Sequence, residues 1–443
     1  MSEQTEEVRP EQRGDVDYMP PLRRAIPLSI QHVLAMFVGN VTVPVVIAGA
    51  VDLPAAQTTA LIQAAMFIAG VATLVQSLGV GRIGARLPVV MGTSFGFVPV
   101  MIPIASTQGL PSVFGAALAG GVAMAVVGLC MRWVRFLFPP VVMGTFVIMI
   151  GVLLLPVGFA YTAGGFGAPD FGAPYHIALA ALVFVITVGL HQFARGFIAE
   201  IGPLVGLVAG FVIAALFGLV DFSDVAAASW VSVPLPWEIG MEFHLSAIVP
   251  MVLLSLVTVS ESVGDLVGIT VGGADREPSE RELSGGVTAD GLSTVLAAFW
   301  SAFPQISFSQ NVGMVALTGV ISRYVVAIGG VFLLVAGLFP KFGAIIGAIP
   351  NAVLGGAVLI MFGMIASAGI KMLSHVPFSR RNMVIIGMSL AMAFGLPEHP
   401  EIYAGLPESA RSMMDSGLIP GAVTAILLNL ILPGGWRPGD GAG

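Results

Sequence analysis

Two acidic residues stand four apart in a long apolar stretch of the chain. Glu261 and Asp265 belong to Thr-Val-Ser-Glu-Ser-Val-Gly-Asp, residues 258–265, and in a helix they would share one face. A charged group at membrane depth costs at least about 2.5–3.5 kcal/mol, so each needs a reason. Two carboxylates on one face repel each other, which favours protonation of one and allows a proton to be exchanged. The alternative is that both lie near the end of the segment and are hydrated.

Neutral polar residues could complete a site for a flat solute. Gln310 and Asn311 lie inside a later apolar segment, and a side-chain amide presents a donor and an acceptor in one plane. That pattern matches the N–H and C=O edge of a nucleobase, and a carboxylate opposite would accept a ring N–H. Phe95 could stack on the ring face, although a phenylalanine in so apolar a protein can equally be ordinary packing.

Two further residues could hold or relay a proton. His32 lies in the first apolar segment, where it could relay protons or donate a structural hydrogen bond between helices. Asp290 lies near the start of a later segment, where an acidic group near a helix N-terminus is favourable without any function.

The composition places these residues in a membrane. Of the 443 residues, 56% are hydrophobic and 10% are charged, against about 25% charged in soluble domains. A spanning helix needs roughly 20 apolar residues. We expect an all-α polytopic protein with fourteen segments. They are 27–49, 58–78, 88–105, 112–131, 139–159, 175–193, 201–219, 244–267, 287–301, 305–321, 324–339, 344–369, 380–397 and 414–432.

The basic residues predict the orientation, because short cytoplasmic loops retain Lys and Arg. With the N-terminus inside, all but two of the eighteen fall on the cytoplasmic side. The exceptions are Lys341 and Arg411. The outer loops 160–174 and 220–243 contain neither Lys nor Arg. We therefore expect a multi-pass protein of the cytoplasmic membrane with both termini in the cytoplasm.

The chain divides into two halves of seven segments, which predicts an inverted repeat with its site at mid-membrane. The third segment of each half, at 88–99 and 304–313, begins with Pro and is rich in Gly, Ser or Thr. Broken backbone is tolerated in a membrane only where it is buried in protein or lines a cavity, so we expect two half-helices that face one site. Small residues that merely permit close packing are the alternative. The expected divisions are a disordered tail (1–24), a first repeat (25–219), an outer loop (220–243), a second repeat (244–433) and a C-terminal tail (434–443).

Several motifs together resemble one family. The run from Gln310 to Arg323, Gln-Asn-Val-Gly-Met-Val-Ala-Leu-Thr-Gly-Val-Ile-Ser-Arg, resembles the signature of the nucleobase-ascorbate transporters, also called nucleobase:cation symporter 2. That signature has Gln or Glu, then Asn-x-Gly, four variable residues and Thr. The Gln31-His32 pair and the segments 92–95, 261–265 and 289–291 follow in the family's order with similar spacing.

The resemblance implies a fourteen-segment inverted repeat with a core domain around the site and a gate domain that forms a homodimer. It implies that substrate is bound by Glu261, Gln310, Phe95, Ser94, Thr93 and Asn311. It also implies that proton coupling involves Glu261, Asp265, Asp290 and His32. No cofactor or metal is expected.

Within the family, Gln at 310 and Asp at 265 are similar to the xanthine and urate branch, since uracil carriers usually have Glu and His there. Thr93 and Ser94 are also similar to the purine branch. One departure is Ser301, where relatives commonly have Asn.

These observations predict secondary active symport of a purine base, xanthine or uric acid, with a proton; Na⁺ stays an open alternative as the coupling ion. A uracil or other nucleobase carrier of the same fold, and an anion carrier of the sulfate and bicarbonate type, are the alternatives. An enzyme lacks support, because no HExxH motif and no His cluster spaced like a metal site is present. The lone Cys130 excludes a disulfide framework, and no basic nucleic-acid surface is present.

Overall fold

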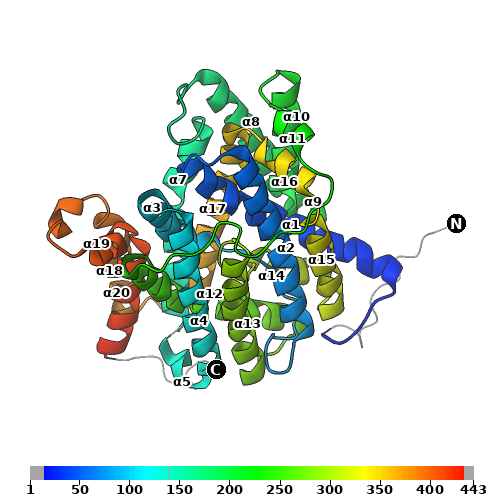
Figure 1. The fold of residues 1–443 in the computed structure, drawn as a ribbon. Helices are drawn as coiled ribbons and strands as arrows, with labels where there is room; N and C mark the ends of the chain where they lie inside the picture. The colour runs from blue at the N-terminus through cyan, green and yellow to red at the C-terminus, as the bar shows by residue number, and fades with distance from the viewer. Residues whose placement is uncertain (1–13, 138, 434–443) are drawn as a thin grey trace.

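The computed structural model describes residues 14–137 and 139–433, which form a bundle of helices with two short strands (Figure 1). The helices of the first half are α1 (Leu22–Ala50), α2 (Ala55–Leu78), η2 (Phe95–Phe97), α3 (Val98–Gln108), α4 (Leu110–Leu129), α5 (Met131–Val134), η3 (Arg135–Leu137), α6 (Pro140–Leu153), α7 (Leu155–Thr162), α8 (Pro174–Phe193), α9 (Phe197–Glu200), α10 (Gly202–Leu216) and α11 (Ser223–Ala227). Those of the second half are α12 (Leu245–Ala274), α13 (Glu280–Phe299), α14 (Ser309–Thr318), α15 (Arg323–Ala336), α16 (Pro340–Gly347), α17 (Asn351–Ser374), α18 (Arg380–Gly395), η4 (Pro400–Tyr403), α19 (Glu408–Asp415) and α20 (Leu418–Ile431). The strands are β1 (Met91–Thr93) and β2 (Gln305–Ser307).

Seven helices in the described part of the chain are long and apolar enough to cross a membrane, counting α6 and α7 as one. An eighth span is possible if α15 and α16, which are bent by 82° at their junction, count together. Three shorter apolar helical stretches in the described residues, Phe95–Gln108, α10 and α20, lie at three further predicted segments. The count of fourteen therefore stays a prediction, and the two terminal tails lie mostly outside the described residues.

Three predicted boundaries need correction. Helix α13 begins at Glu280 rather than 287, because Ser279 and Glu282 form a reciprocal capping box. Helix α12 continues to Ala274 rather than 267. The predicted segment 344–369 is two helices, since α16 ends at Gly347 and α17 begins after Pro350, whose ring removes a backbone donor and restricts the residue before it.

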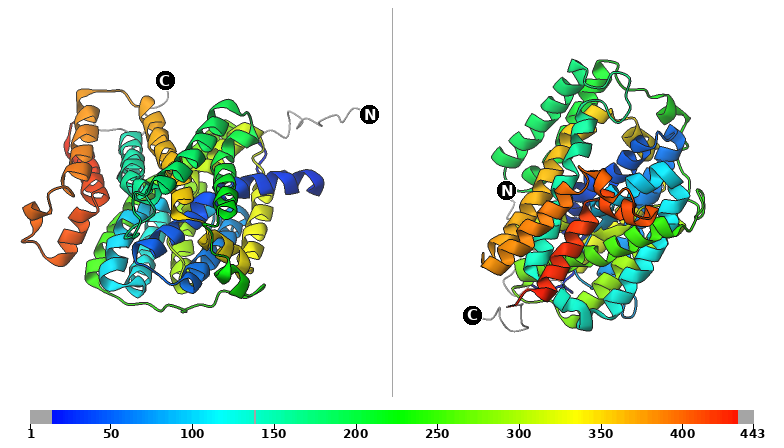
Figure 2. Two further views of the ribbon diagram at one scale, coloured as in Figure 1. Left: turned by 90° about the horizontal axis from the view of Figure 1, so that it is seen from above. Right: turned by 90° about the vertical axis from the view of Figure 1, so that its left-hand side faces the viewer.

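The helices pack as two groups. In the first group, α4 packs on α13 and α12, and α2 packs on α15. In the second group, α17 packs on α6 and α8, α8 on α10, and α18 on α6 and α20. Figure 2 shows α18 and α20, in orange and red, standing to one side of the first group. When each of the first seven segments is interchanged with its counterpart in the second seven, the α2–α15 contact becomes the α4–α13 contact and the α8–α10 contact becomes the α18–α20 contact. This symmetry of the contacts supports the predicted repeat.

The two Pro-initiated segments are both interrupted and meet inside the first group, as predicted. Strands β1 and β2 pair antiparallel, with Thr93 opposite Gln305. Beyond the strands, Ser94 N donates to Pro304 O at 2.9 Å and Phe308 N donates to Val90 O at 3.0 Å. The pairing satisfies backbone groups that would otherwise be buried unbonded. Helix α3 follows β1 by way of η2, and α14 follows β2.

The crossing of the strands is closely packed because glycines leave room for one aromatic ring. The ring of Phe308 occupies the space that a Cβ atom would need on Gly39 in α1 and on Gly92 in β1, where its nearest ring atoms would lie 2.6 and 2.5 Å away. A larger residue at either position would displace the ring.

Candidate functional site

One face of α12 contacts both interrupted segments. A Cβ atom on Gly96 would lie 3.6 Å from Thr258 Cγ2, so η2 packs against α12 at this point. Two turns further along, Asp265 accepts hydrogen bonds from Ser309 at 2.7 Å and from Ser307 at 3.1 Å. Glu261 lies between these two contacts on the same face. The structure therefore places the predicted carboxylate pair beside the ends of both strands.

Glu261 is the one member of this pair that has an unused acceptor. Its Oε2 atom is buried without a hydrogen-bond partner, although the side chain as a whole is partly exposed. A buried carboxylate oxygen without a donor is costly, and such groups are usually paired in native proteins. The arrangement is suited to a solute that brings its own N–H donor. Because α12 extends to Ala274, Glu261 and Asp265 lie in its interior rather than at a hydrated end.

Gln310 and Phe95 lie at the starts of the two helices that follow the strands. Gln310 is the second residue of α14, is partly exposed, and follows Ser309, which bonds Asp265. Asp265 is one helical turn, about 6 Å, from Glu261. Phe95 begins η2, is 6% exposed, and contacts Phe362 of α17 edge to face, with 5.3 Å between ring centroids. Phe95 thus lies where the two helix groups meet.

Thr93 and Ser94 stabilise the strand crossing. Both the amide and the hydroxyl of Thr93 donate to Asn40 Oδ1 of α1, at 2.8 and 3.0 Å, and Gln305 donates to the Thr93 hydroxyl at 3.3 Å. Ser94 caps η2 by accepting from Gly96 N at 3.2 Å. Asn40 Nδ2 and Gln305 Oε1, a donor and an acceptor on either side of Thr93, are buried without partners.

His32 and Asn311 connect α1 to α14. Their side chains are both buried, with 2.6 Å between His32 Nδ1 and Asn311 Oδ1, and Asn311 Nδ2 donates to the backbone oxygen of Pro88. This geometry matches the structural alternative for His32, a hydrogen bond between helices. Asn311 has both ends of its amide occupied and contacts the segment before β1.

Asp290 lies in the interior of α13, ten residues from its start, and not near a helix N-terminus as its alternative reading required. It is fully buried and accepts from Gln76 of α2 at 2.8 Å and from Ser262 of α12 at 2.5 Å. Asp290 thus connects α13 to α2 and α12, and its partner on α12, Ser262, is the residue next to Glu261.

Sequence reasoning missed the partners of these residues. The side chains that bond the predicted site residues are Asn40, Gln76, Ser262, Gln305, Ser307 and Ser309. Their polar types inside apolar segments were the available signal, since a buried polar side chain needs a partner. Their pairings span up to 214 residues of sequence, and no local pattern encodes them.

The departure at Ser301 concerns backbone conformation. Ser301 adopts a φ of +53°, a left-handed conformation that Asn tolerates better than Ser. Its hydroxyl accepts from Ile239 N at 3.2 Å in the long connection before α12. The replacement therefore affects the anchoring of that connection rather than the predicted substrate contacts.

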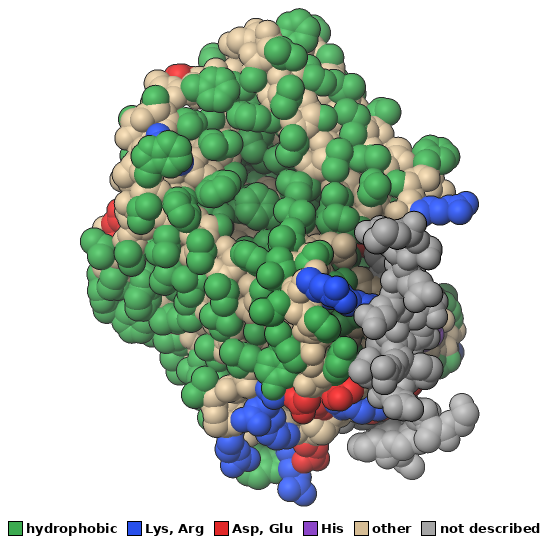
Figure 3. All heavy atoms as spheres, turned by 90° about the vertical axis from the view of Figure 1, so that its right-hand side faces the viewer, with side chains coloured by type: hydrophobic (Ala, Val, Ile, Leu, Met, Phe, Trp, Pro, Cys, Tyr) green, Lys and Arg blue, Asp and Glu red, His purple; other side chains and the backbone are tan. Residues whose placement is uncertain are grey.

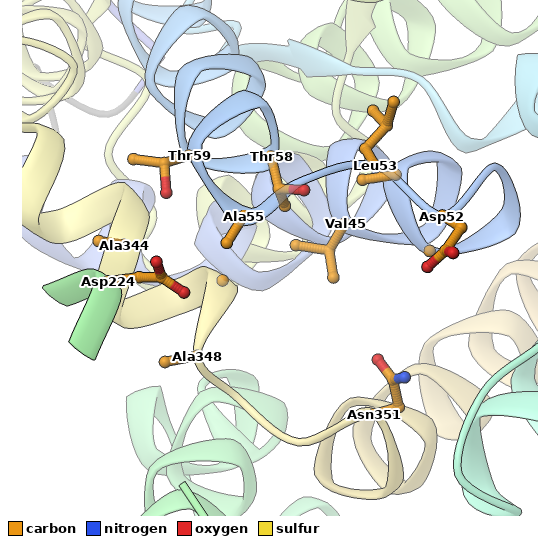
Figure 4. Close-up of a pocket in the computed structure, with 13 residues that line it drawn as sticks. Val45, Asp52, Leu53, Ala55, Thr58, Thr59, Asp224, Ala344, Ala348 and Asn351 are labelled. Carbon is orange, nitrogen blue, oxygen red and sulfur yellow. The ribbon is translucent and has the colours of Figure 1, made fainter. Parts of the chain in front are cut away.

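A separate cavity of about 200 Å³ lies at the far end of α1 (Figure 4). Asp52, Thr58, Thr59, Asp224 and Asn351 supply its polar side chains, and Val45 is among its apolar lining residues. None of the predicted site residues is among its lining residues, so this cavity is distinct from the α12 site. Within residues 14–137 and 139–433, no three His, Cys, Asp or Glu side chains converge as a metal site would require.

The fold is that of a known class of membrane transporters. The structure resembles the transmembrane domain of a cyanobacterial bicarbonate transporter, BicA, with a TM-score of 0.60 and 16% identity over 94% of this chain and 99% of that one. It resembles SLC26A9 with a TM-score of 0.61 and 12% identity over 92% of this chain and 66% of that one. At such identities the likeness concerns the fold alone.

Sequence comparison identifies the family. A family model described as "Permease family" matches residues 23–402. The chain is 41% identical to the uric acid permease PucK of Bacillus subtilis, over 91% of this chain and 94% of that one, and 38% identical to the xanthine permease of the same organism, over 92% and 93%. It is 33% identical to the xanthine permease XanQ of Escherichia coli K12, over 96% and 94%. The chain belongs to this permease family, which confirms the resemblance found from its motifs. It is a multi-pass membrane permease and not an enzyme.

Proposed function

We propose that this permease carries an oxidised purine base, xanthine or uric acid, across the cytoplasmic membrane in symport with a proton. The base would be held by its edge between Glu261 and Gln310, with Phe95 against its ring face. Thr93, Ser94 and Asn311 would shape the slot. The observation that carries the proposal is the buried, unpartnered Oε2 of Glu261, between the contacts that α12 makes with the two interrupted segments.

The chemistry of the base supports this assignment. Xanthine and uric acid present ring N–H groups beside carbonyl oxygens along one edge. A carboxylate accepts from the N–H groups, and a glutamine amide can donate to a carbonyl and accept from an N–H at the same time. Relatives named as xanthine and uric acid permeases, at 33–41% identity, favour the same substrates.

The acidic residues support proton coupling. Glu261, Asp265 and Asp290 lie in the interiors of α12 and α13, and within the described residues none of the three forms an ion pair with Lys or Arg. A carboxyl group inside a membrane helix without a cationic partner is more stable when it is protonated. A substrate that donates a hydrogen bond to Glu261 would change this protonation equilibrium. We propose Glu261 as the group that joins substrate to proton, with Asp265, Asp290 and the His32–Asn311 pair holding the geometry around it.

The second helix group supports a moving partner. Phe95 contacts Phe362 of α17 at the boundary between the groups, so relative movement there would open the slot to one side and then the other. We propose that the first group is the core domain, that the second is the gate domain, and that the permease acts as a homodimer.

Uptake into sealed, right-side-out membrane vesicles tests the proposal. With an inward proton gradient and no sodium, labelled xanthine or uric acid should accumulate and should be released by a protonophore. Excess unlabelled xanthine or uric acid should compete, while uracil, sulfate and bicarbonate should not. Accumulation that requires sodium would reject the proton assignment, and competition by sulfate instead of purines would favour the anion carrier.

A further inference from the structure

A second cavity, of about 480 Å³, lies at one end of the first helix group. It is lined by the connection after α2, by the junction of α4 and α5, and by the first turn of α13. Three arginines line it: Arg82, Arg132 and Arg281. Figure 3 shows Lys and Arg side chains, with Asp and Glu side chains beside them, at one end of the molecule below a band of hydrophobic surface.

The positive charge of this cavity is not neutralised. Glu280 is the one carboxylate among its lining residues, which include three guanidinium groups. The neighbouring Glu282 is already engaged with Arg276, at 2.6 and 2.8 Å. In the part of the chain that the structure describes, no ion pair includes any of the three arginines, whereas Arg276 and Arg323 both have carboxylate partners. A cavity with this balance attracts an anion.

An exposed apolar stripe leads to the cavity. Val122, Val126 and Leu129 lie on one face of α4 and are 47%, 53% and 67% exposed, and their spacing is that of a helix face. Trp133, in α5, continues the stripe into the cavity lining and is 74% exposed. Tryptophan is typical of the membrane–water interface. A soluble anion would need no such stripe.

We propose that this cavity binds the phosphate of an anionic phospholipid whose acyl chains lie along α4. The arginines donate to the phosphate oxygens, as guanidinium groups do in other phosphate sites, and Trp133 lies at the level of the glycerol backbone. Helix α4 packs on α12 and α13, which carry Glu261 and Asp290. The bound lipid thus stabilises the helix pair next to the substrate site.

Binding of phosphatidylglycerol to the purified full chain tests the proposal. Phosphatidylglycerol, phosphatidylcholine and inorganic phosphate are titrated separately in detergent, with native mass spectrometry and the melting temperature as readouts. The test variant is Arg82→Gln with Arg132→Gln; it leaves Arg281, which bonds Gly81 O at 3.1 Å. The matched control, Arg195→Gln with Arg380→Gln, removes two exposed arginines elsewhere.

Phosphatidylglycerol should bind the parent and the control, raise their melting temperatures more than phosphatidylcholine does, and bind the test variant on the order of 30-fold more weakly. Equal binding by the test variant would overturn the proposal. Protection by inorganic phosphate at the same concentrations as the lipid would also overturn it, in favour of a soluble anion. Both results are independent of purine transport.

Discussion

The carboxylate of Glu261 has a neighbourhood unlike those of the other acidic residues around it. Asp265 and Asp290 each have both oxygens bonded, to Ser307 and Ser309 and to Gln76 and Ser262 respectively. Glu261 keeps a buried oxygen without a donor. Fully satisfied polar groups fix a structure, whereas an unsatisfied one is available to a ligand. This difference supports the proposal that Glu261 binds the substrate and that the two aspartates hold the surrounding framework.

Gln310→Glu should change the choice among bases. A carboxylate cannot donate, so a base that offers a carbonyl opposite residue 310 loses one hydrogen bond and meets a negative charge. We expect xanthine binding to weaken by about tenfold or more, since a buried unpaired polar group costs about 1–3 kcal/mol. Uracil should bind relatively better. Titration of xanthine, uric acid and uracil against both proteins measures the ratio, and an unchanged ratio would remove Gln310 from the site.

The sequence singled out polar residues of the apolar segments that the structure places near one another, but it did not predict which of them have their hydrogen bonds satisfied. An acidic or amide side chain in an apolar segment is visible because its burial needs a reason. Whether it is satisfied depends on partners from other helices, such as Asn40 for Thr93 or Gln76 for Asp290. Those contacts depend on tertiary packing. The family resemblance placed Thr93 and Ser94 among the substrate contacts and gave no sign of their role in the strand crossing.

At the level of elements, the strand crossing positions the site. Pro and Gly punctuation was enough to predict that residues 88–99 and 304–313 are interrupted, because the Pro and polar residues exclude ordinary spanning helices. The antiparallel register, with Met91 opposite Ser307, was outside what punctuation encodes. The start of α13 could have been read from Ser-x-x-Glu at 279–282, which has the form of a capping box.

Gly92→Ala should destabilise this crossing. Its new methyl group would meet Phe308 Cε2 at 2.5 Å and Met36 Cε at 2.7 Å, and overpacking of this kind costs about 1–3 kcal/mol. We expect a lower melting temperature and weaker xanthine binding. Gly272→Ala, which has open space around it, is the matched control.

Phe308→Leu added to Gly92→Ala should recover part of the lost stability, because it frees the same space. A melting temperature of Gly92→Ala equal to that of the parent would contradict the close packing described for the strand crossing.

For the whole molecule, the sequence predicted the fold class because composition alone requires a membrane. The packing of α2 on α15 and of α4 on α13 agrees with a repeat but does not give the direction of each half in the membrane. The predicted direction of each half depends on the side of the membrane to which the Lys and Arg residues of the loops are assigned.

Cysteine accessibility tests the orientation. The one native cysteine, Cys130, is first replaced by Ser, and a single Cys is then introduced in place of Glu238 or of Arg195. In intact cells an impermeant maleimide should label position 238, in the predicted outer loop, and should reach position 195 only after permeabilisation. Labelling in the reverse order, or of both positions from one side, would contradict the predicted topology.

The most direct test of the account is equilibrium binding of labelled xanthine or uric acid to the purified parent and to Glu261→Gln. Loss of one partner of a buried charged hydrogen bond costs about 2–5 kcal/mol, so binding should fall by at least about 30-fold. Glu277→Gln, at an exposed position, should bind like the parent. Binding of a purine base by Glu261→Gln at the parent's affinity would contradict the central claim that this carboxylate holds the substrate.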